Sequence, residues 1–232
     1  MVAVWDWPTR AFHWLLVVCL ISAWPSYQYA ETLGDPTMKW HRYNGYAVLV
    51  LVVFRVLWGF LGSSTARWAA FLRWPWTAAS YGLDLLRGRD RKFLGHNPLG
   101  TYMILGLLAA VSTQATLGLM VVEHNDTTWG PLYKLVGEAR QKDVLRWHAL
   151  LLYWAILPLV AAHIIANTLY AVLKRDPLIR AMVTGRKPAA DYEDQREAVI
   201  ARDVTLRALG TLVLALGIVA GGIMALGGKL FY

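Results

Sequence analysis

The residues of this chain best suited to chemistry are histidines in or beside apolar segments. His148 and His163 lie fifteen residues apart in an otherwise almost wholly apolar stretch. On an α-helix that spacing corresponds to about 22 Å along the axis and about 60° around it, so both rings would face one bundle interior at two depths. His13 and His41 lie near the starts of two other apolar segments. Because imidazole binds transition metals and carries protons, the set predicts metal ligation or proton transfer within a membrane.

Composition assigns the chain to the membrane. Its 232 residues are 57% hydrophobic and only 16% charged, whereas soluble domains carry about 25% charged residues. In a membrane protein the formal charge of +8 is first a signal of orientation, so we expect no nucleic-acid partner. Cys19 is the only cysteine, which excludes an internal disulfide, a Cys-x-x-Cys-His attachment for c-type haem and a cysteine-based iron–sulfur cluster.

The apolar blocks predict five membrane-spanning helices. These are residues 10–30, 40–61, 98–122, 144–173 and 205–227. We expect the first span to be retained rather than cleaved as a signal peptide, because its first positive charge, Arg10, follows an Asp and a Pro. Residues 68–86 mix aromatic, aliphatic and Arg side chains at near-helical spacing, which predicts an interfacial helix. We expect two domains, a four-helix core over 1–190 and a cytoplasmic linker with the fifth helix over 191–232.

The basic residues predict the orientation of these spans. The connections 62–97 and 174–204 hold thirteen Lys and Arg residues, against four in the links 31–39 and 123–143. The positive-inside rule therefore places the two basic connections in the cytoplasm, with the N-terminus inside and the C-terminus outside. We expect a multi-pass protein of the bacterial inner membrane.

This orientation sorts the four histidines by depth. His41 and His148 begin spans that start outside and form an outer pair, while His13 and His163 form an inner pair nearer the cytoplasm. Each pair joins two different spans, which suits axial ligation on the two faces of a haem b. The pattern therefore predicts two haem b groups. The alternative is a histidine-based proton or metal transporter without haem, which the absence of Asp and Glu from every predicted span weakens.

Two further residues each allow two interpretations. His96, at the mouth of the third span, either hydrogen-bonds at the helix start or takes part in a quinone site. Arg55, near the inner end of the second span, either extends to the interface or pairs with a haem propionate. His124, in an outer link, is expected to be solvated.

Five separated motifs lie between residues 4 and 188. They are Val4–Trp14, His41–Tyr46, Phe54–Gly62, Gly95–Gly100 and Arg180–Lys187. Together they resemble the bacterial cytochrome b561 family, which includes the cytochrome b subunits of nickel–iron hydrogenases.

The resemblance implies a four-helix di-haem b core with one additional C-terminal transmembrane helix. In that family His13, His41, His148 and His163 would occupy the places of the haem ligands. The core would exchange electrons between membrane quinone and a periplasmic redox partner, such as a hydrogenase or a c-type cytochrome. We expect the quinone on the cytoplasmic side, near His13 and His96. The fifth span departs from the simplest four-span members and would anchor the chain or dock a partner.

The residues leave the wider assembly open. They do not decide between an electron-transfer subunit of an oxidoreductase and a free-standing quinone oxidoreductase. The expected partners are membrane lipid, quinone and a periplasmic redox protein or hydrogenase-type subunit, with a homodimer also considered.

Overall fold

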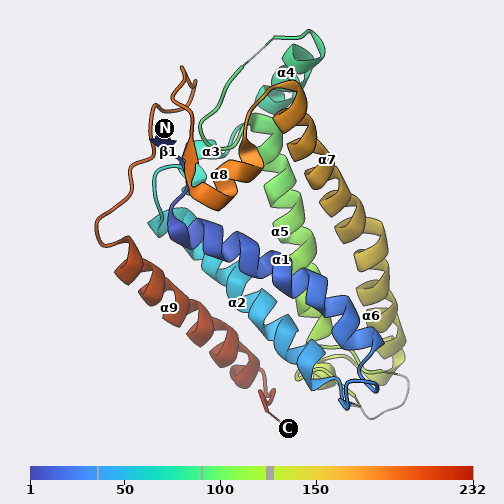
Figure 1. Cartoon of the computed structure of the whole chain (residues 1–232). Coiled ribbons are helices and arrows are strands. Elements are labelled where there is room, and N and C mark those ends of the chain that lie inside the picture. The colour runs from blue at the N-terminus through green and yellow to red at the C-terminus, as the bar shows by residue number, and fades with distance from the viewer. Residues whose placement is uncertain (36, 90, 124–127, 232) are drawn as a thin grey trace. The chain divides into compact units, whose positions relative to one another are not determined.

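The computed structural model describes residues 1–35, 37–89, 91–123 and 128–231, and helices make up most of that part of the chain (Figure 1). His124 lies outside the described residues. The helices are α1 (Trp7–Gln28), α2 (Lys39–Leu61), α3 (Trp68–Phe71), α4 (Pro75–Leu86), α5 (Pro98–Gly118), α6 (Glu138–Leu151), α7 (Leu157–Leu173), α8 (Leu178–Thr184) and α9 (Val204–Ala225), with short segments η1 (Tyr133–Leu135) and η2 (Leu152–Ile156).

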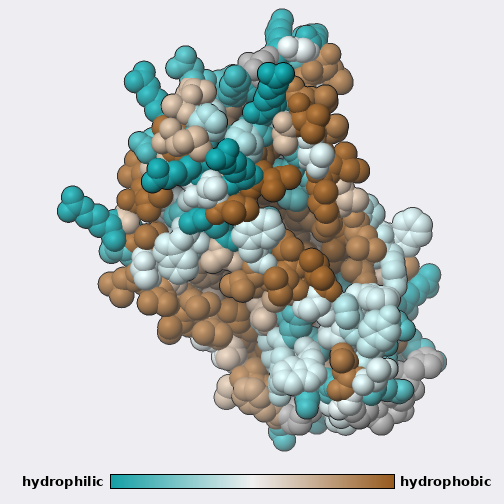
Figure 2. All heavy atoms as spheres, in the orientation of Figure 1, coloured by the Kyte–Doolittle hydropathy of each residue, from teal (hydrophilic) through white to brown (hydrophobic). Residues whose placement is uncertain are grey.

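Four helices of the described part are long and apolar enough to cross a membrane. They are α2, α5, the continuous helix Glu138–Leu173 and α9, and hydrophobic side chains cover the α9 region in Figure 2. This confirms the predicted all-α membrane class. Helix α1 lies where the first span was predicted but is not among the four, because Arg10, His13 and Pro25 lower its hydropathy. The count of five spans therefore stays a prediction.

Helix ends differ from the predicted spans where local chemistry intervenes. The third span was predicted to reach residue 122, but α5 ends at Gly118. The predicted interfacial helix is two helices, α3 and α4, because Pro75 begins α4 and forces the preceding Trp74 into an extended conformation. A short antiparallel pair, β1 (Val2–Ala3) with β2 (Arg186–Lys187), was not predicted. Strands are predicted from the alternation of apolar and polar residues, and a strand of two residues is too short to show it.

A π-helical segment, η2, interrupts the long fourth helix directly before Pro158. Proline lacks an N–H and clashes with the carbonyl four residues earlier in an α-helix. A π turn relieves this conflict because its backbone hydrogen bonds span five residues instead of four. A π turn advances fewer degrees per residue than an α-helix. The estimate of 60° between His148 and His163 assumes a continuous α-helix, and it stays a prediction.

The chain separates into two compact units that divide its long helices between them. Unit 1 comprises Met1–Phe12, Arg55–Leu107 and Leu159–Thr211. Unit 2 comprises His13–Phe54, Leu108–Pro158 and Leu212–Tyr232. The predicted division into a core over 1–190 and a C-terminal part over 191–232 stays a prediction.

In unit 1 a buried carboxylate holds the N-terminal segment. Asp6 is 1% exposed and accepts hydrogen bonds from the backbone N–H groups of Thr9 (2.8 Å) and Ser63 (3.0 Å). It also accepts one from the indole N–H of Trp58, at 3.2 Å. The bond from Thr9 caps the start of α1, and the other two attach Asp6 to the end of α2.

The residues after α8 complete this core. Gly185 ends α8 with φ at 76°, and its carbonyl accepts hydrogen bonds from the backbone of Val4 (2.8 Å) and Trp5 (3.3 Å). A Cβ at this position would lie 2.8 Å from the carbonyl oxygen of Trp5, so glycine is required here. Lys187 is 1% exposed and forms an ion pair with Asp176 at 2.9 Å.

Candidate functional site

Unit 2 brings His41 and His148 together. His41 lies in the first turn of α2 and His148 in the last turn of α6. Their ring centres are 6.4 Å apart and the ring planes are nearly perpendicular, at 83°. Both residues are half-buried. They are the two members of the predicted outer pair.

Backbone carbonyls set the protonation of both rings. Nδ1 of His41 lies 2.9 Å from the carbonyl oxygen of Ala23, and Nδ1 of His148 lies 3.0 Å from the carbonyl oxygen of Gln114. A carbonyl oxygen only accepts hydrogen bonds, so Nδ1 carries the proton in each neutral ring. Nε2 of each ring then keeps the lone pair that a metal ion would bind, which is the usual arrangement of histidine ligands.

Helix α5 contacts the His148 ring through two residues. The side-chain amide nitrogen of Gln114 lies 3.3 Å from Nε2 of His148, where it donates to the lone pair that metal ligation would use. The amide oxygen Oε1 of Gln114 is buried and has no hydrogen-bond partner among the described residues. Gly118 leaves room for the ring, because a Cβ there would lie 3.2 Å from Cε1 of His148.

A cavity of about 160 Å³ adjoins the two histidines. Most of its lining is apolar, with Gly45 and Gly118 among the residues that leave space in the wall. Arg42 and Glu123 also line it. Burial raises the pKa of Glu123, and a hydrogen bond from Tyr27 opposes this shift in part. The cavity therefore combines an apolar wall with two imidazole rings and a small number of polar groups, as cofactor sites do.

The donor set fits one metal ion held between two imidazoles. Two rings that bind one ion from opposite sides have their centres about 6 Å apart, because each metal–nitrogen bond is about 2 Å long. The 6.4 Å separation of His41 and His148 matches this value. Among the described residues no group of three or more His, Cys, Asp or Glu side chains lies close enough together to hold a metal ion. An iron that already carries four equatorial ligands needs only this pair, so the residues fit the predicted bis-histidine haem centre.

The predicted inner pair is divided between the two units. His13, in unit 2, is half-buried and packs edge-on against Trp14, with ring centres 4.9 Å apart. His163, in unit 1, is half-buried, and the side-chain nitrogen of Asn167 lies 3.4 Å from both of its ring nitrogens. The pairing of His13 with His163 stays a prediction.

Arg55 is buried in unit 1 and packs against aromatic rings. It is 3% exposed, and its guanidinium lies 4.7 Å from the ring centre of Trp68 and 5.6 Å from that of Phe71. Nη1 is buried and has no hydrogen-bond partner among the described residues. A buried guanidinium favours an anionic partner, so extension to the membrane interface is not what holds this side chain. A haem propionate as that partner stays a prediction.

His96 lies between two aromatic rings in unit 1. Its ring centre is 4.6 Å from that of Trp5 and 4.7 Å from that of Phe71. The following helix start has its own cap, because the side-chain oxygen of Asn97 accepts a hydrogen bond from the backbone of Gly100 at 2.7 Å. Helix α5 begins at Pro98, where the third span was predicted to begin. The quinone role of His96 stays a prediction.

Sequence reasoning missed the residues that hold the outer histidines. Ala23 and Gln114 act through backbone carbonyls, and no pattern of residue types reports such a contact. The side chains of Gln114 and Asn44 did leave a signal, since each is an amide within a predicted apolar span. Asn44 donates to the carbonyl oxygen of Cys19 at 2.8 Å, and so joins α2 to α1 near His41.

Comparison with known proteins gives a family match that covers the residues described above. The family model for prokaryotic cytochrome b561 matches residues 4–185. The chain is 25% identical to a probable Ni/Fe-hydrogenase B-type cytochrome subunit of Bradyrhizobium diazoefficiens, over 82% of this chain and 87% of the relative. A protein of the same name from Rhodobacter capsulatus is 27% identical over 82% of each chain. A probable Ni/Fe-hydrogenase 1 B-type cytochrome subunit of Escherichia coli is 24% identical over 78% of this chain and 88% of the relative. No solved structure matches the chain.

Proposed function

Because the chain belongs to the prokaryotic cytochrome b561 family, we propose that it is a di-haem b membrane cytochrome that carries electrons across the bilayer. The observation that supports this most strongly is the His41–His148 pair, with ring centres 6.4 Å apart beside an apolar cavity. Haem b, when bound, supplies an iron that gains and loses one electron. The chain's own task is to hold the two imidazoles in place and to keep water away from them.

The outer haem would be held by His41 and His148. Their Nδ1–H groups donate to backbone carbonyls, which fixes the ring orientations and makes Nε2 the ligand atom. Two fixed histidine ligands leave no open position on the iron, which favours electron transfer over oxygen binding. The side-chain amide of Gln114 would give up its contact with His148 Nε2 when iron takes that position.

The inner haem would be held by His13 and His163. Arg55 would pair with a propionate of that haem, because its buried Nη1 suits a carboxylate better than an apolar contact. This assignment rests on the predicted depths of the two histidines, and the domain that contains both haems would be residues 1–190.

The electron donor and acceptor are proposed by analogy. The relatives are named as subunits of nickel–iron hydrogenases, so a periplasmic hydrogenase or another periplasmic redox protein is the proposed partner at the outer haem. Membrane quinone is the proposed partner at the inner haem, near His96. The proposed location is the bacterial inner membrane, with the N-terminus in the cytoplasm.

Haem content tests the proposal directly. The full chain, purified from membranes in mild detergent, should give a pyridine haemochrome spectrum of b type with about two haems per chain. The alternative, a haem-free proton or metal transporter, predicts a folded and colourless protein. A folded preparation that carries no haem after expression with adequate haem supply would overturn the proposal.

The pairing of ligands needs a second experiment. We expect His41→Ala and His148→Ala each to remove the same redox component in a potentiometric titration, and His13→Ala and His163→Ala each to remove the other. A His124→Ala variant serves as a control and should keep both components. If His41→Ala and His13→Ala removed the same component, the depth assignment would be wrong.

A further inference from the structure

The buried guanidinium of Arg55 lies against a helix of only four residues, α3, in unit 1. Its distances to the ring centres of Trp68 and Phe71 are 4.7 Å and 5.6 Å, and these two residues are the first and the last of α3. Their own ring centres are 5.5 Å apart. Helix α3 therefore places two aromatic rings next to one buried cation.

The indole of Trp68 lies directly on the backbone of α2. Its Nε1–H donates a hydrogen bond to the carbonyl oxygen of Val56 at 3.0 Å, and Val56 directly follows Arg55. A Cβ at Gly59 would overlap Nε1 and Cε2 of Trp68, so the indole can lie here only because residue 59 is glycine. Glycine weakens a helix interior. Its presence in α2 allows the close approach that brings Trp68 to Arg55.

Hydrogen bonds fix α3 at both ends. Directly before α3, Nε of Arg67 donates to the carbonyl oxygen of Gly62 at 2.9 Å, which attaches its start to the end of α2. At its other end, the hydroxyl of Thr101 donates to the carbonyl oxygen of Phe71 at 2.7 Å, which attaches it to α5. A single helical turn is not stable alone in water, so these contacts are what hold the two rings in place.

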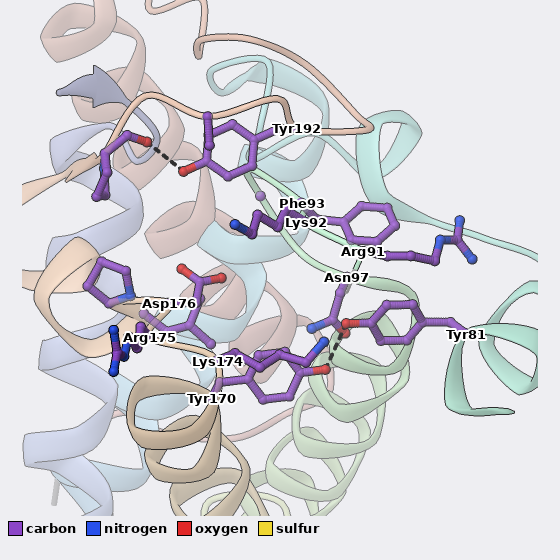
Figure 3. A pocket seen from close by; sticks show the side chains of 15 residues that line it. Tyr81, Arg91, Lys92, Phe93, Asn97, Tyr170, Lys174, Arg175, Asp176 and Tyr192 are labelled. Carbon is purple, nitrogen blue, oxygen red and sulfur yellow. Dashed lines mark hydrogen bonds between the residues drawn. The ribbon is translucent and has the colours of Figure 1, made fainter. Parts of the chain in front are cut away.

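The segment that follows α3 is fixed as well. Between α3 and α4, the carbonyl oxygen of Arg73 accepts a hydrogen bond from the hydroxyl of Tyr102 at 2.8 Å. Further along, the hydroxyls of Tyr81 in α4 and Tyr170 in α7 form a hydrogen bond at 2.8 Å, which Figure 3 shows as a dashed line. Because α3 and α4 are attached to α2, α5 and α7, the two rings keep their places rather than follow the arginine side chain.

The guanidinium held by these rings keeps a donor for an anion. Nη1 of Arg55 is buried and has no hydrogen-bond partner among the described residues. Among those residues, Asp6 is the carboxylate that acts on Arg55 electrostatically, but its oxygens already accept hydrogen bonds from three N–H groups. The face of an aromatic ring stabilises a desolvated cation, but it is not the acceptor that a guanidinium N–H requires. The remaining donor suits a carboxylate.

We propose that Trp68 is a positioning residue, which acts through Arg55 by holding its guanidinium where a carboxylate can pair with it. The inference rests on the proposed function, in which that carboxylate is a propionate of the inner haem. A positive charge beside an iron centre favours the reduced form, because that form carries one positive charge fewer. Trp68 therefore helps to set the reduction potential of the inner haem without being one of its ligands.

Potentiometric titration of the full chain, purified with its haem, tests the proposal. The inner haem is identified as the redox component that His163→Ala removes. We expect Arg55→Gln to lower the equilibrium constant for its reduction about tenfold, which is about 59 mV for one electron. Trp68→Leu should lower it in the same direction by about threefold or more, because the guanidinium loses the ring that holds it. Trp68→Phe keeps an aromatic face and should restore most of the loss.

A double variant separates positioning from support of the fold. If Trp68 acts through Arg55, Trp68→Leu should cause no further fall in the Arg55→Gln background. Gly59→Ala displaces the Trp68 ring without removing it, and it should repeat the effect of Trp68→Leu in both backgrounds. Trp74→Leu is the matched control. It removes an indole of unit 1 that is 68% exposed and stacks on Trp76, and it should leave the potential of the inner haem unchanged.

The outcomes distinguish this inference from the proposed function. Equal falls for Trp68→Leu with and without Arg55→Gln would show that Trp68 acts independently of Arg55. An unchanged potential in both Trp68→Leu and Gly59→Ala would show that the ring does not position the guanidinium. Either result overturns the inference while both haem components remain. No shift in Arg55→Gln would remove the propionate pairing and the inference with it, and a folded chain without haem would overturn the proposed function itself.

Discussion

At the outer histidine pair, space for one imidazole depends on the absence of a single methyl group. A Cβ at Gly118 would lie 3.2 Å from Cε1 of His148, which is tighter than nine in ten Cβ contacts in proteins. We expect Gly118→Ala to displace the His148 ring and to lower the content of the outer haem by at least half, as measured by haem per chain. Gly217→Ala, where a Cβ meets nothing within 4 Å, is the matched control. Full haem content in Gly118→Ala would show that the ring adapts.

Asp6 is the residue on which the N-terminal segment depends. Its carboxylate receives three N–H donors while 1% exposed. Asp6→Asn removes the negative charge and replaces one acceptor oxygen by an NH2 group, which cannot accept a hydrogen bond from these N–H donors. Each buried group left without a partner costs about 1–3 kcal/mol. We expect a fall of several degrees in melting temperature. Asp203→Asn, which disturbs an exposed pair with Arg207, should leave the melting temperature nearly unchanged, and equal effects in both variants would contradict the role given to Asp6.

The ion pair between Glu193 and Arg91 should make the stability of unit 1 depend on pH in the acidic range. The hydrogen bond from Arg91 lowers the pKa of Glu193. A carboxyl group whose pKa is lowered by folding stabilises the fold above its unfolded pKa, near 4.3 for Glu. It loses that contribution as the pH falls through the lower folded pKa.

We therefore expect Glu193→Gln to melt a few degrees lower than the wild type at pH 7, since a pair this exposed contributes little. The difference should begin to decline below the unfolded pKa of Glu, near 4.3, and should disappear once the pH lies below the lower folded pKa. Melting curves in detergent across this pH range provide the measurement. A difference that stays constant down to pH 3 would mean that the pair does not act through its charge.

Among the elements, η2 offers the sharpest experiment. A π turn is an α-helix that holds one extra residue, so deletion of Ala155 within η2 should restore an α-helix without rotating the flanking segments. Deletion of Ala161 in α7 should instead rotate His163 by about 100° relative to the segment before it. If the chain binds two haems as proposed, we expect the first variant to keep both and the second to lose about half of its haem. Similar haem contents in the two deletions would contradict this account of η2.

The long apolar helices were the most predictable elements. Spans 40–61 and 205–227 agree with α2 and α9 to within two residues, because sustained hydropathy reports helix length directly. The β1–β2 pair and η2 were not predictable, since both result from contacts or steric conflicts that a residue pattern does not encode. At the site, the meeting of His41 with His148 followed from counting spans and their directions. The carbonyls of Ala23 and Gln114 that orient these rings did not.

At the scale of the whole molecule, orientation is the prediction with the widest consequences. In a Cys19→Ala background, Lys134→Cys should react with a membrane-impermeant maleimide applied from the periplasmic side. Arg89→Cys, in the basic 62–97 connection, should react only after the membrane is permeabilised, because positive connections stay in the cytoplasm. Lys229→Cys, near the C-terminus, should behave like Lys134→Cys if the chain crosses the membrane five times. Protection of Lys229→Cys together with labelling of Lys134→Cys would indicate an even number of crossings.

The carbonyl acceptors at the outer histidines also bear on how such a protein evolves. Every residue has a backbone carbonyl, so substitutions at positions 23 and 114 leave the proton on Nδ1 of both rings as long as the helices keep their places. The orientation of these imidazoles is thus inherited with the path of α1 and α5 rather than with any side chain. Relatives whose residues at these two positions have diverged would keep the same ring nitrogen, Nε2, unprotonated. A search for invariant neighbours of the histidines would overlook the carbonyls that hold them.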